Sequence, residues 1–339
     1  MAGISDAEAV DVSVVIPTHG RPELLRKAIA SALGQDFGSL EVIVVVDGEE
    51  EQTRAALGAF YDARLIVMKL AASVGGAEAR NIGVRAARGR WIAFLDDDDE
   101  WLPHKLSRQI VAARRSRAAW PVVSSRMMVR TAEYEMVRPL RSYEPKRPVS
   151  EFLFCRRSLK DGPFAMQTST LMMPRELMLA VPFRSGLRRH QDWDWVLRAE
   201  RAFGVEFTVV DEPLVVYRTE DRRASVGRAQ DWEFSMEWGR EMRGHFSAKA
   251  YSWFLAAECA SRAAKSHAGI AAYAEIARRF VLDGRPSLMS TAMLVFFFGF
   301  PRGLRKKFHG LMRGWRRRSS RAAFSARRGD AGAAIRMEV

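Results

Sequence analysis

One stretch, Arg90–Trp101 (RWIAFLDDDDEW), constrains the fold of this chain more than any other. Its apolar run Trp91–Leu95 has the length and composition of a buried β-strand and leads directly into four consecutive carboxylates, Asp96 to Asp99. Adjacent carboxylates repel one another, so a fold keeps them together most easily around a cation or a set of hydrogen-bond donors.

Side-chain alternation along an extended strand predicts that Asp96 and Asp98 face one side and Asp97 the other. Oxygen ligands of this kind suit Mg²⁺ or Mn²⁺, which proteins commonly share with substrate phosphates. A solvated acidic turn that caps a helix starting near Pro103 is the alternative interpretation. The metal–phosphate site is favoured because ligands in α/β proteins gather at the carboxyl ends of strands.

The first hundred residues alternate between strand-like runs and helical spacings. Strands are expected at Val12–Ile16, Glu41–Val46, Arg64–Met68 and Trp91–Leu95, with helices between them. This alternation predicts an α/β fold with a doubly wound, mostly parallel sheet, in which one half resembles a Rossmann nucleotide-binding unit. The loops after three of these strands carry His19–Arg21, Asp47 and Asp96–Asp98, and we expect them to meet at one edge of the sheet.

Two helix starts carry further polar residues. The glycine-rich stretch Ser73–Arg90 places Arg80 and Asn81 in the first turns of a helix, where a cation suits a phosphate, although a solvated arginine fits equally well. The stretch Arg188–Glu200 sets Asp192 at the start of another helix, where its carboxylate can cap backbone amides without any other function.

The middle of the chain has a less regular pattern. Residues 131–163 are expected to form a loop-and-hairpin insertion and Ala165–Met173 a strand. Val205–Val210 and Pro213–Arg218 are expected to be two short strands that close the domain.

Positive charge is concentrated in the C-terminal third of the chain. Residues 1–225 hold 33 Lys or Arg against 31 Asp or Glu, whereas residues 226–339 hold 21 against 9. Leu288–Phe300 is a run of thirteen uncharged residues, shorter than the ~20 that a membrane span needs. Residues 302–328 follow with eleven Lys or Arg and no acidic residue. An apolar run followed by a polybasic run predicts an interfacial anchor to anionic lipid. A buried helix is the alternative interpretation of the apolar run.

The cysteine content and the N-terminal sequence bear on the cellular compartment of the protein. Two cysteines give neither a disulfide framework nor a metal-binding spacing, and the N-terminus lacks the pattern of a signal peptide. These features predict a cytoplasmic enzyme, peripheral at the inner face of the membrane. We expect a catalytic domain over residues 1–225, a helical region over 226–318 and a disordered basic tail over 319–339. No nucleic-acid-binding signature is present, and a nucleic-acid partner is not expected.

Four segments in order resemble glycosyltransferase family 2, the inverting enzymes of GT-A fold. They are VSVVIPTHGRPELLRKAIASALGQDF, EVIVVVDG, ARNIGVRAARGRWIAFLDDDDEW and HQDWDWVLR, within residues 12–220. The resemblance implies transfer of a sugar from a nucleotide sugar, most often UDP-linked, to a hydroxyl group of an acceptor. With the basic C-terminal region, it points to a lipid-linked glycan or polysaccharide acceptor in cell-envelope or exopolysaccharide synthesis.

The resemblance also assigns roles to residues. Asp192 would be the catalytic base, Asp47 would bind the nucleotide base, and Asp98 would bind Mn²⁺ or Mg²⁺ together with Asp96. The nucleotide-sugar-binding set that it implies is Pro17, Thr18, His19, Arg21, Asp47, Arg80, Asn81, Asp96 and Asp97.

Two departures from the family pattern leave alternatives open. Gln191 stands before Asp192 where an acidic residue is usual, and Asp194 is a nearby rival for the base. The family often has a metal-binding His after a Tyr-Arg pair; here Glu220 or Asp221 follows instead, and His190 is a further substitute. Two other functions remain alternatives: a non-catalytic nucleotide-sugar-binding or scaffold protein, and a nucleic-acid binder acting through the basic tail.

Overall fold

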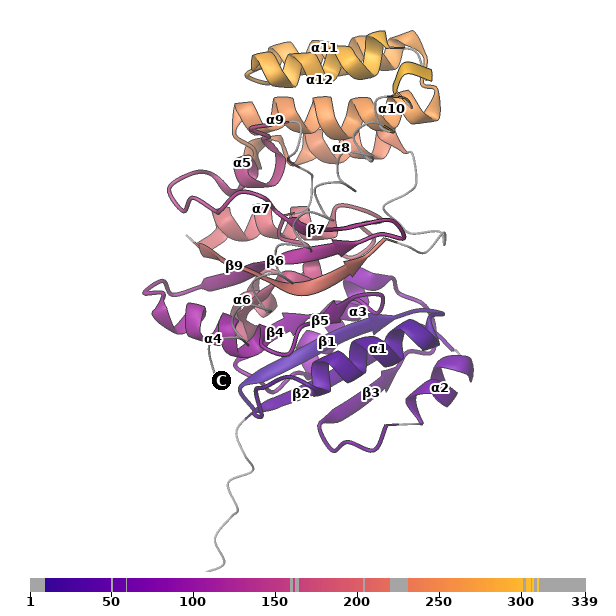
Figure 1. Ribbon diagram of the computed structural model, residues 1–339, viewed down its shortest axis with the longest axis vertical. Helices are drawn as coiled ribbons and strands as arrows, with labels where there is room; N and C mark the ends of the chain where they lie inside the picture. The colour runs from indigo at the N-terminus through magenta and orange to yellow at the C-terminus, as the bar shows by residue number, and fades with distance from the viewer. Residues whose placement is uncertain are drawn as a thin grey trace, which may run out of the picture.

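The computed structural model describes residues 10–49, 51–58, 60–158, 161, 165–203, 205–219, 231–300, 303–305, 307 and 310. In this part of the chain nine strands form one sheet, in the order β3-β2-β1-β4-β8-β6-β9-β5, with β7 paired to β6 (Figure 1). The strands are β1 Val12–Thr18, β2 Leu40–Val46, β3 Leu65–Lys69, β4 Trp91–Phe94, β5 Glu100–Trp101, β6 Pro121–Arg130, β7 Glu135–Arg138, β8 Met172–Pro174 and β9 Glu206–Arg218.

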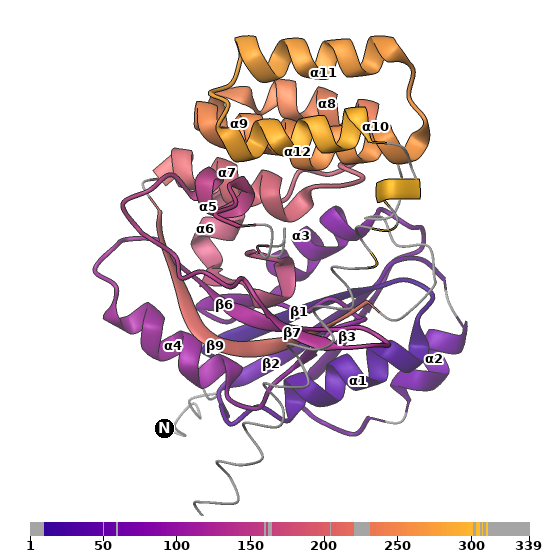
Figure 2. The same cartoon turned by 45° about the horizontal axis from the view of Figure 1, so that its top comes forward.

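Helices cover both faces of this sheet and continue into a C-terminal helical layer (Figures 1 and 2). Those around the sheet are α1 Pro22–Leu33, α2 Glu51–Leu57, α3 Gly76–Ala86, α4 Lys105–Arg115, α5 Val149–Phe154, η1 Thr168–Thr170, α6 Arg175–Ala180 and α7 Gln191–Phe203. The C-terminal layer comprises α8 Trp232–Glu241, η3 Arg243–His245, α9 Ala248–Phe254, the π-helix η4 Leu255–Cys259, α10 Ala260–Ser266, α11 Ile270–Leu282 and α12 Leu288–Gly299.

The first four strands run parallel, as the strand–helix alternation predicted. Strand β1 pairs in parallel with both β2 and β4, and β2 pairs in parallel with β3. All seven residues of β1 and of β2 are buried, because helices pack on both faces of a parallel sheet. Alternate residues of β1 enter two different cores: Val15 contributes to the core under α3 and α7, and Val14 and Ile16 to the core under α1 and α4.

The second half of the sheet differs in detail from the prediction. Instead of two closing strands, β9 is a single strand parallel to β6, and the register shift between Ser125 and Arg126 accommodates Asp211 and Glu212. The predicted strand Ala165–Met173 is also wrong over most of its length. The Gln167 side chain accepts the Ser169 amide and starts the 3₁₀ turn η1, which leaves only the short strand β8.

The C-terminal helices share the core that lies under α3 and α7. Aromatic rings from both parts of the chain pack together: Phe154 lies 5.5 Å from Phe254, and Trp193 lies 6.5 Å from Trp238, measured between ring centroids. Within α12, the described side chains of Ser290 and Leu294 are buried, whereas Leu288 is 92% exposed. The apolar run therefore forms a helix that lies on the surface of the layer.

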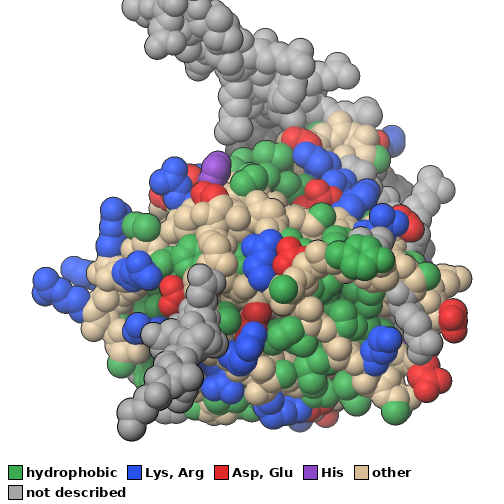
Figure 3. All heavy atoms as spheres, turned by 90° about the horizontal axis from the view of Figure 1, so that it is seen from below, with side chains coloured by type: hydrophobic (Ala, Val, Ile, Leu, Met, Phe, Trp, Pro, Cys, Tyr) green, Lys and Arg blue, Asp and Glu red, His purple; other side chains and the backbone are tan. Residues whose placement is uncertain are grey.

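The end of the molecule opposite the C-terminal layer has a mixed surface. On the face seen in Figure 3, which lies away from α11 and α12, basic and acidic side chains are interspersed among apolar ones. Among the described residues, no helix combines the length and the apolarity required to cross a bilayer.

Candidate active site

The four carboxylates leave β4 in a tight turn rather than in an extended strand. The Asp99 amide donates to the Asp96 carbonyl at 3.1 Å, which bends the chain at Asp97 and Asp98. Asp96 and Asp98 still share one side, as predicted, but the turn brings Asp99 to the same side. Single carboxylate oxygens of Asp96, Asp98 and Asp99 all lie within 4.8 Å of one another.

Asp97 is not a member of this group of three and ties the turn to the loop after β1. Thr18 Oγ1 donates to Asp97 Oδ2 at 2.8 Å, and Arg21 Nη1 donates to Asp97 Oδ1 at 3.0 Å. The same Arg21 nitrogen lies 2.8 Å from Asp98 Oδ2. His19 Nδ1 lies 2.7 Å from the Asp47 carbonyl oxygen, so the loops after β1, β2 and β4 meet at one edge of the sheet.

The Asp47 carboxylate holds the loop that leads into α3. It accepts hydrogen bonds from Ser73 Oγ at 2.9 Å, from the Val74 amide at 2.6 Å and from the Gly75 amide at 2.9 Å. This carboxylate thereby fixes where α3 begins. Its contact with a nucleotide base stays a prediction.

Arg80 connects three elements of the site. Its guanidinium is buried and pairs with Asp96, and its Nη1 donates to Gln191 Oε1 at 2.9 Å. Helix α3, the acidic turn and the start of α7 are therefore held together by one cation. Asn81 lies apart from this cluster, because its amide exchanges two 2.9 Å hydrogen bonds with the backbone of Phe183.

Sequence reasoning missed the group of residues that supports Asp99. Ser169 Oγ donates to Asp99 Oδ2 at 2.6 Å, and Gln167 Nε2 contacts Asp99 Oδ2 at 3.1 Å and Asp96 Oδ2 at 3.0 Å. Among the described residues, Asp99 Oδ1 is buried and has no hydrogen-bond partner. The unbroken run of four aspartates was the available signal for Asp99, but nothing in the sequence marked Gln167 or Ser169.

The acidic turn carries more negative charge than its surroundings compensate. Burial, with the charges of Asp96 and Asp97 added, raises the pKa of Asp98 to about 6. Burial raises the pKa of Asp99 well above its usual range and also raises that of Asp97. Three clustered carboxylates and an unpartnered buried oxygen are a donor set that fits a hard divalent cation.

Asp192 lies in the first turn of α7, beside this cluster. Its Oδ1 accepts the Trp193 amide at 2.9 Å, which is the local capping contact that the sequence allowed. Burial, reinforced by the negative charge of Asp96, raises the pKa of Asp192 to about 6. A carboxyl group with this pKa is ionised at neutral pH and has a proton affinity that suits a general base.

The rival Asp194 is committed to the fold. Its carboxylate is fully buried, pairs with Arg184 at 2.7 Å and with Arg198 at 2.8 Å, and accepts Trp238 Nε1 at 3.1 Å. His190 is also packed: its ring stacks on Trp193 at 4.8 Å, and burial lowers its pKa well below the usual range. Glu220 and Asp221, considered as a third metal ligand, lie outside the described residues.

Comparison with known proteins identifies the catalytic half of the chain. The family model described as glycosyl transferase family 2 matches residues 13–178. The chain carries a family 2 glycosyltransferase domain. The match includes β1, β2, α3 and the acidic turn, which hold three of the four segments on which the sequence resemblance rested. The fourth segment, HQDWDWVLR, lies beyond residue 178.

Relatives agree with this assignment. The amylovoran biosynthesis glycosyltransferase AmsB of Erwinia amylovora is 26% identical over 285 residues, which cover 81% of this chain and 92% of that protein. The Escherichia coli protein named UDP-Glc:alpha-D-GlcNAc-diphosphoundecaprenol beta-1,3-glucosyltransferase WfaP is 35% identical over 99 residues, which are 29% of this chain and 39% of WfaP. This glycosyltransferase is thus similar to AmsB over most of its length and to WfaP over a shorter segment.

A solved structure extends the likeness to the fold. The mannosyltransferase PcManGT from Pyrobaculum calidifontis, in complex with GDP-Man and Mn²⁺, superimposes with a TM-score of 0.54 at 16% sequence identity. The match covers 90% of this chain and 82% of PcManGT. This likeness confirms the predicted GT-A fold. The predicted glycosyltransferase class is confirmed by the family model and by the named relatives.

Proposed function

We propose that this glycosyltransferase is an inverting, metal-dependent enzyme that moves a sugar from a nucleotide sugar to a hydroxyl group of a lipid-linked or polysaccharide acceptor. By analogy with WfaP, the donor is UDP-linked. The enzyme's biological role is then cell-envelope or exopolysaccharide synthesis, which is supported by the similarity to AmsB, a protein named for amylovoran biosynthesis. The observation that carries the proposal is the convergence of Asp96, Asp98 and Asp99 beside Arg80 and Asp192.

The chain's own residues account for the donor half of the reaction. Arg80 and Arg21 place two guanidinium groups at the acidic turn, where the diphosphate of a donor has to lie for a shared cation to contact it. A Mg²⁺ or Mn²⁺ ion held by Asp96, Asp98 and Asp99 would supply electrostatic stabilisation of the departing nucleoside diphosphate.

The acceptor half rests on Asp192. Its carboxylate takes the proton of the acceptor hydroxyl while the hydroxyl oxygen forms the new bond to the anomeric carbon, and the nucleoside diphosphate leaves from the opposite face. One such displacement inverts the anomeric carbon and needs no nucleophile from the protein. Asp194 is not available for this role, because Arg184 and Arg198 hold its carboxylate in the core.

Thermal stability in the presence of nucleotides tests the donor site. A ligand at 100 times its dissociation constant adds about 2.7 kcal/mol of stability. We expect one of UDP, GDP, dTDP or CDP to raise the melting temperature with Mn²⁺ or Mg²⁺ and to do so far less with chelator. No shift with any nucleotide would contradict the donor site, and equal shifts with chelator would contradict the metal site.

Attachment to the inner face of the cell membrane completes the proposal. Apolar side chains project from the outer helices of the C-terminal layer: Ile270 and Leu282 on α11 are 88% and 67% exposed, and Leu288 on α12 is 92% exposed. The polybasic residues 302–328 follow α12 directly in the sequence. An apolar surface that is followed in the sequence by clustered basic residues fits an anionic bilayer surface.

Vesicle flotation tests this attachment. We expect the protein to float with vesicles that contain anionic lipid and to remain in solution with neutral vesicles. The double variant Leu282→Ser, Leu288→Ser should reduce flotation, whereas Tyr61→Ser, which changes an exposed side chain of the catalytic domain, should not. Equal flotation of the double variant would contradict the role of α11 and α12.

A further inference from the structure

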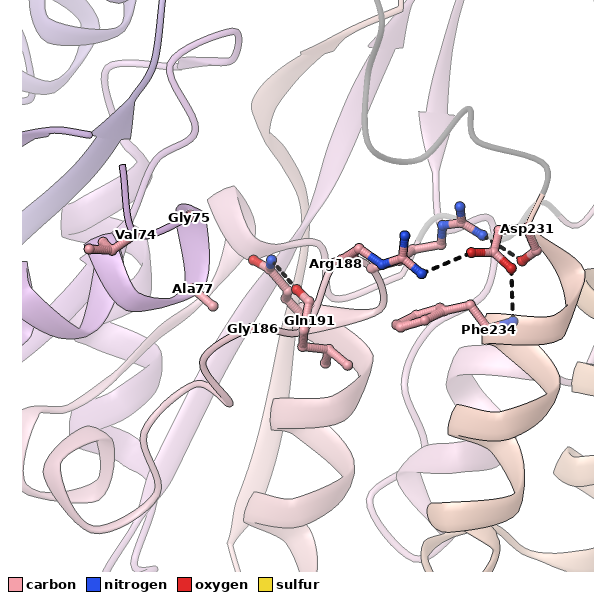
Figure 4. A pocket seen from close by; sticks show the side chains of 11 residues that line it. Val74, Gly75, Ala77, Gly186, Arg188, Gln191, Asp231 and Phe234 are labelled. Carbon is pink, nitrogen blue, oxygen red and sulfur yellow. Dashed lines mark hydrogen bonds and ion pairs between the residues drawn. The ribbon is translucent and has the colours of Figure 1, made fainter. Parts of the chain in front are cut away.

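Helix α8 of the C-terminal layer meets the start of α7, which carries the candidate base (Figure 4). A pocket of about 370 Å³ lies at this joint, and its walls come from three segments far apart in the sequence. They are the start of α3 (Val74–Ala77), the loop before α7 with Gln191 (Gly186–Arg189), and the start of α8 (Asp231 and Phe234).

The first contact between the two helices is made by the residue that caps α8. Asp231 Oδ1 accepts the Phe234 amide at 2.9 Å, and its Oδ2 pairs with Arg188 Nη2 at 3.1 Å (Figure 4). The carboxylate that begins α8 therefore also holds the loop that leads into α7.

His190, the residue before α7, is anchored more firmly in α8. Its backbone φ is +65°, in the left-handed region that side chains rarely adopt, and its carbonyl accepts the Asp194 amide at 2.7 Å in the first turn of α7. The ring is buried, with Nε2 at 3.0 Å from Ser235 Oγ and its centroid at 4.7 Å from that of Trp238. A strained backbone persists where the surrounding contacts over-determine it, and Ser235 and Trp238 supply two of these contacts.

Asp194, two residues after Asp192, is anchored in the same helix. Trp238 Nε1 donates to Asp194 Oδ1 at 3.1 Å, and both side chains are buried. Trp238 therefore contacts the residues on both sides of Asp192: His190 through its ring and Asp194 through its indole N–H. Ser235 lies one turn earlier on α8.

The Asp192 carboxylate has no such anchor of its own. It accepts the Trp193 amide of its own helix at 2.9 Å, and among the described residues no side chain of another element forms a hydrogen bond or an ion pair with it. Its place is therefore set by the first turn of α7. A general base has to lie within hydrogen-bond reach of the proton that it takes, and a displacement of about 1 Å can cost about 10²-fold in rate.

We propose that Ser235 and Trp238 are positioning residues for the transfer reaction, because they hold the turn that carries Asp192. The C-terminal layer then completes the active site, in addition to the membrane attachment proposed above. This inference rests on the proposed function, in which Asp192 is the base. Helix α8 lies beyond the segment that the family model matches.

The test measures UDP release by the full chain from UDP-glucose, UDP-galactose and UDP-N-acetylglucosamine with Mn²⁺. Water takes the place of the acceptor hydroxyl, so the products are UDP and the free sugar, and the UDP-sugar that is hydrolysed fastest serves as the substrate. The test variant Ser235→Ala, Trp238→Phe removes the hydroxyl and the indole N–H but keeps an aromatic ring in the core. The matched control Ser252→Ala, Trp253→Phe makes the same two changes on α9, where both side chains are buried and Ser252 Oγ donates to the Phe280 carbonyl at 3.4 Å.

We expect the test variant to lose about tenfold or more in kcat, with its KM for the UDP-sugar and its affinity for UDP with Mn²⁺ within about twofold of the wild type. The control variant should keep its kcat within about twofold of the wild type, because it changes the same layer away from α7. In the Asp192→Asn background the two test substitutions should cause no further loss of kcat, because they act through Asp192.

Three results would overturn the inference: equal kcat of the test and control variants, a parallel loss of UDP affinity, or an undiminished effect in the Asp192→Asn background. If the test variant does not fold, Ser235→Ala alone decides by the same criteria, with Ser252→Ala as its control. A wild type that neither binds UDP with Mn²⁺ nor releases UDP, or whose activity survives Asp192→Asn, overturns the proposed function itself.

Discussion

Replacing Asp192 by Asn should abolish sugar transfer and at the same time stabilise the protein. Loss of a general base slows a reaction by about 10²–10⁴-fold. The stability gain follows from burial, because the folded protein holds Asp192 with a pKa of about 6 rather than the ordinary value of about 3.9. Ionising this group in the fold at pH 7.5 therefore opposes folding by up to about 3 kcal/mol, which the neutral Asn avoids.

The sign of this effect can be read from its pH dependence. Burial raises the pKa of Asp192 in the folded protein, so the fold favours the protonated carboxyl group. The contribution of this group to the free energy of unfolding is therefore complete below the unfolded-state pKa and is lost as the pH rises through about 6. Urea denaturation of the wild type and Asp192→Asn should thus differ most at pH 7.5 and by about half as much at pH 5. Asn can still accept the Trp193 amide, so the local cap survives.

Asp194→Asn is the matched control, two residues further along α7. It removes one partner of a buried ion-pair network with Arg184 and Arg198, and we expect it to destabilise the protein by about 3 kcal/mol or more. The reasoning would be refuted if Asp192→Asn lost stability as Asp194→Asn does, or if it kept transfer within a few-fold of the wild type. Wild-type transfer should also decline as the pH falls below about 6, because protonated Asp192 cannot accept the acceptor's proton.

Three other substitutions test the rest of the site and its support. Asp98→Ala should remove the dependence of nucleotide affinity on Mn²⁺ in titration calorimetry, and an unchanged dependence would place the cation elsewhere. Gln167→Leu should weaken Mn²⁺ binding in the presence of nucleotide by about tenfold, because Gln167 orients Asp96 and Asp99; unchanged affinity would make it a structural residue only. Gly83→Ala should destabilise the protein by about 1–3 kcal/mol, because its Cβ would lie 2.4 Å from Val15 Cγ1, whereas Gly244→Ala, whose Cβ meets nothing within 4 Å, should not.

The parts of the fold that could be predicted from the sequence are those in which one periodic signal decides the structure. Strands β1, β2 and β4 are buried on both faces, and an uninterrupted apolar run is the consequence. Because parallel strands end at the same edge, the residues that follow β1, β2 and β4 had to meet. His19, Arg21 and the acidic turn do so.

The parts that escaped prediction depend on contacts between distant segments. Asp99 joins Asp96 and Asp98 because a turn replaces the extended strand, and Gln167 reaches them from 68 or more residues away. Strand β9 reads as two strands in the sequence because the bulge at Asp211 and Glu212 interrupts its apolar run. The pocket beside Gln191 is formed by three separate segments, so no local pattern could reveal it.

Under the proposed function, the two arginines at the acidic turn have a consequence for the order in which ligands enter. Arg21 lies 2.8 Å from Asp98, and Arg80 pairs with Asp96, so positive charge lies at the carboxylates that a cation would use. A cation arriving alone has to displace both guanidinium groups, which leaves Arg21 with Asp97 as its carboxylate partner and takes Asp96 away from Arg80. A cation arriving on a diphosphate supplies the displaced arginines with new partners. Turnover should therefore follow the concentration of the metal–donor complex, with metal and donor entering as one particle.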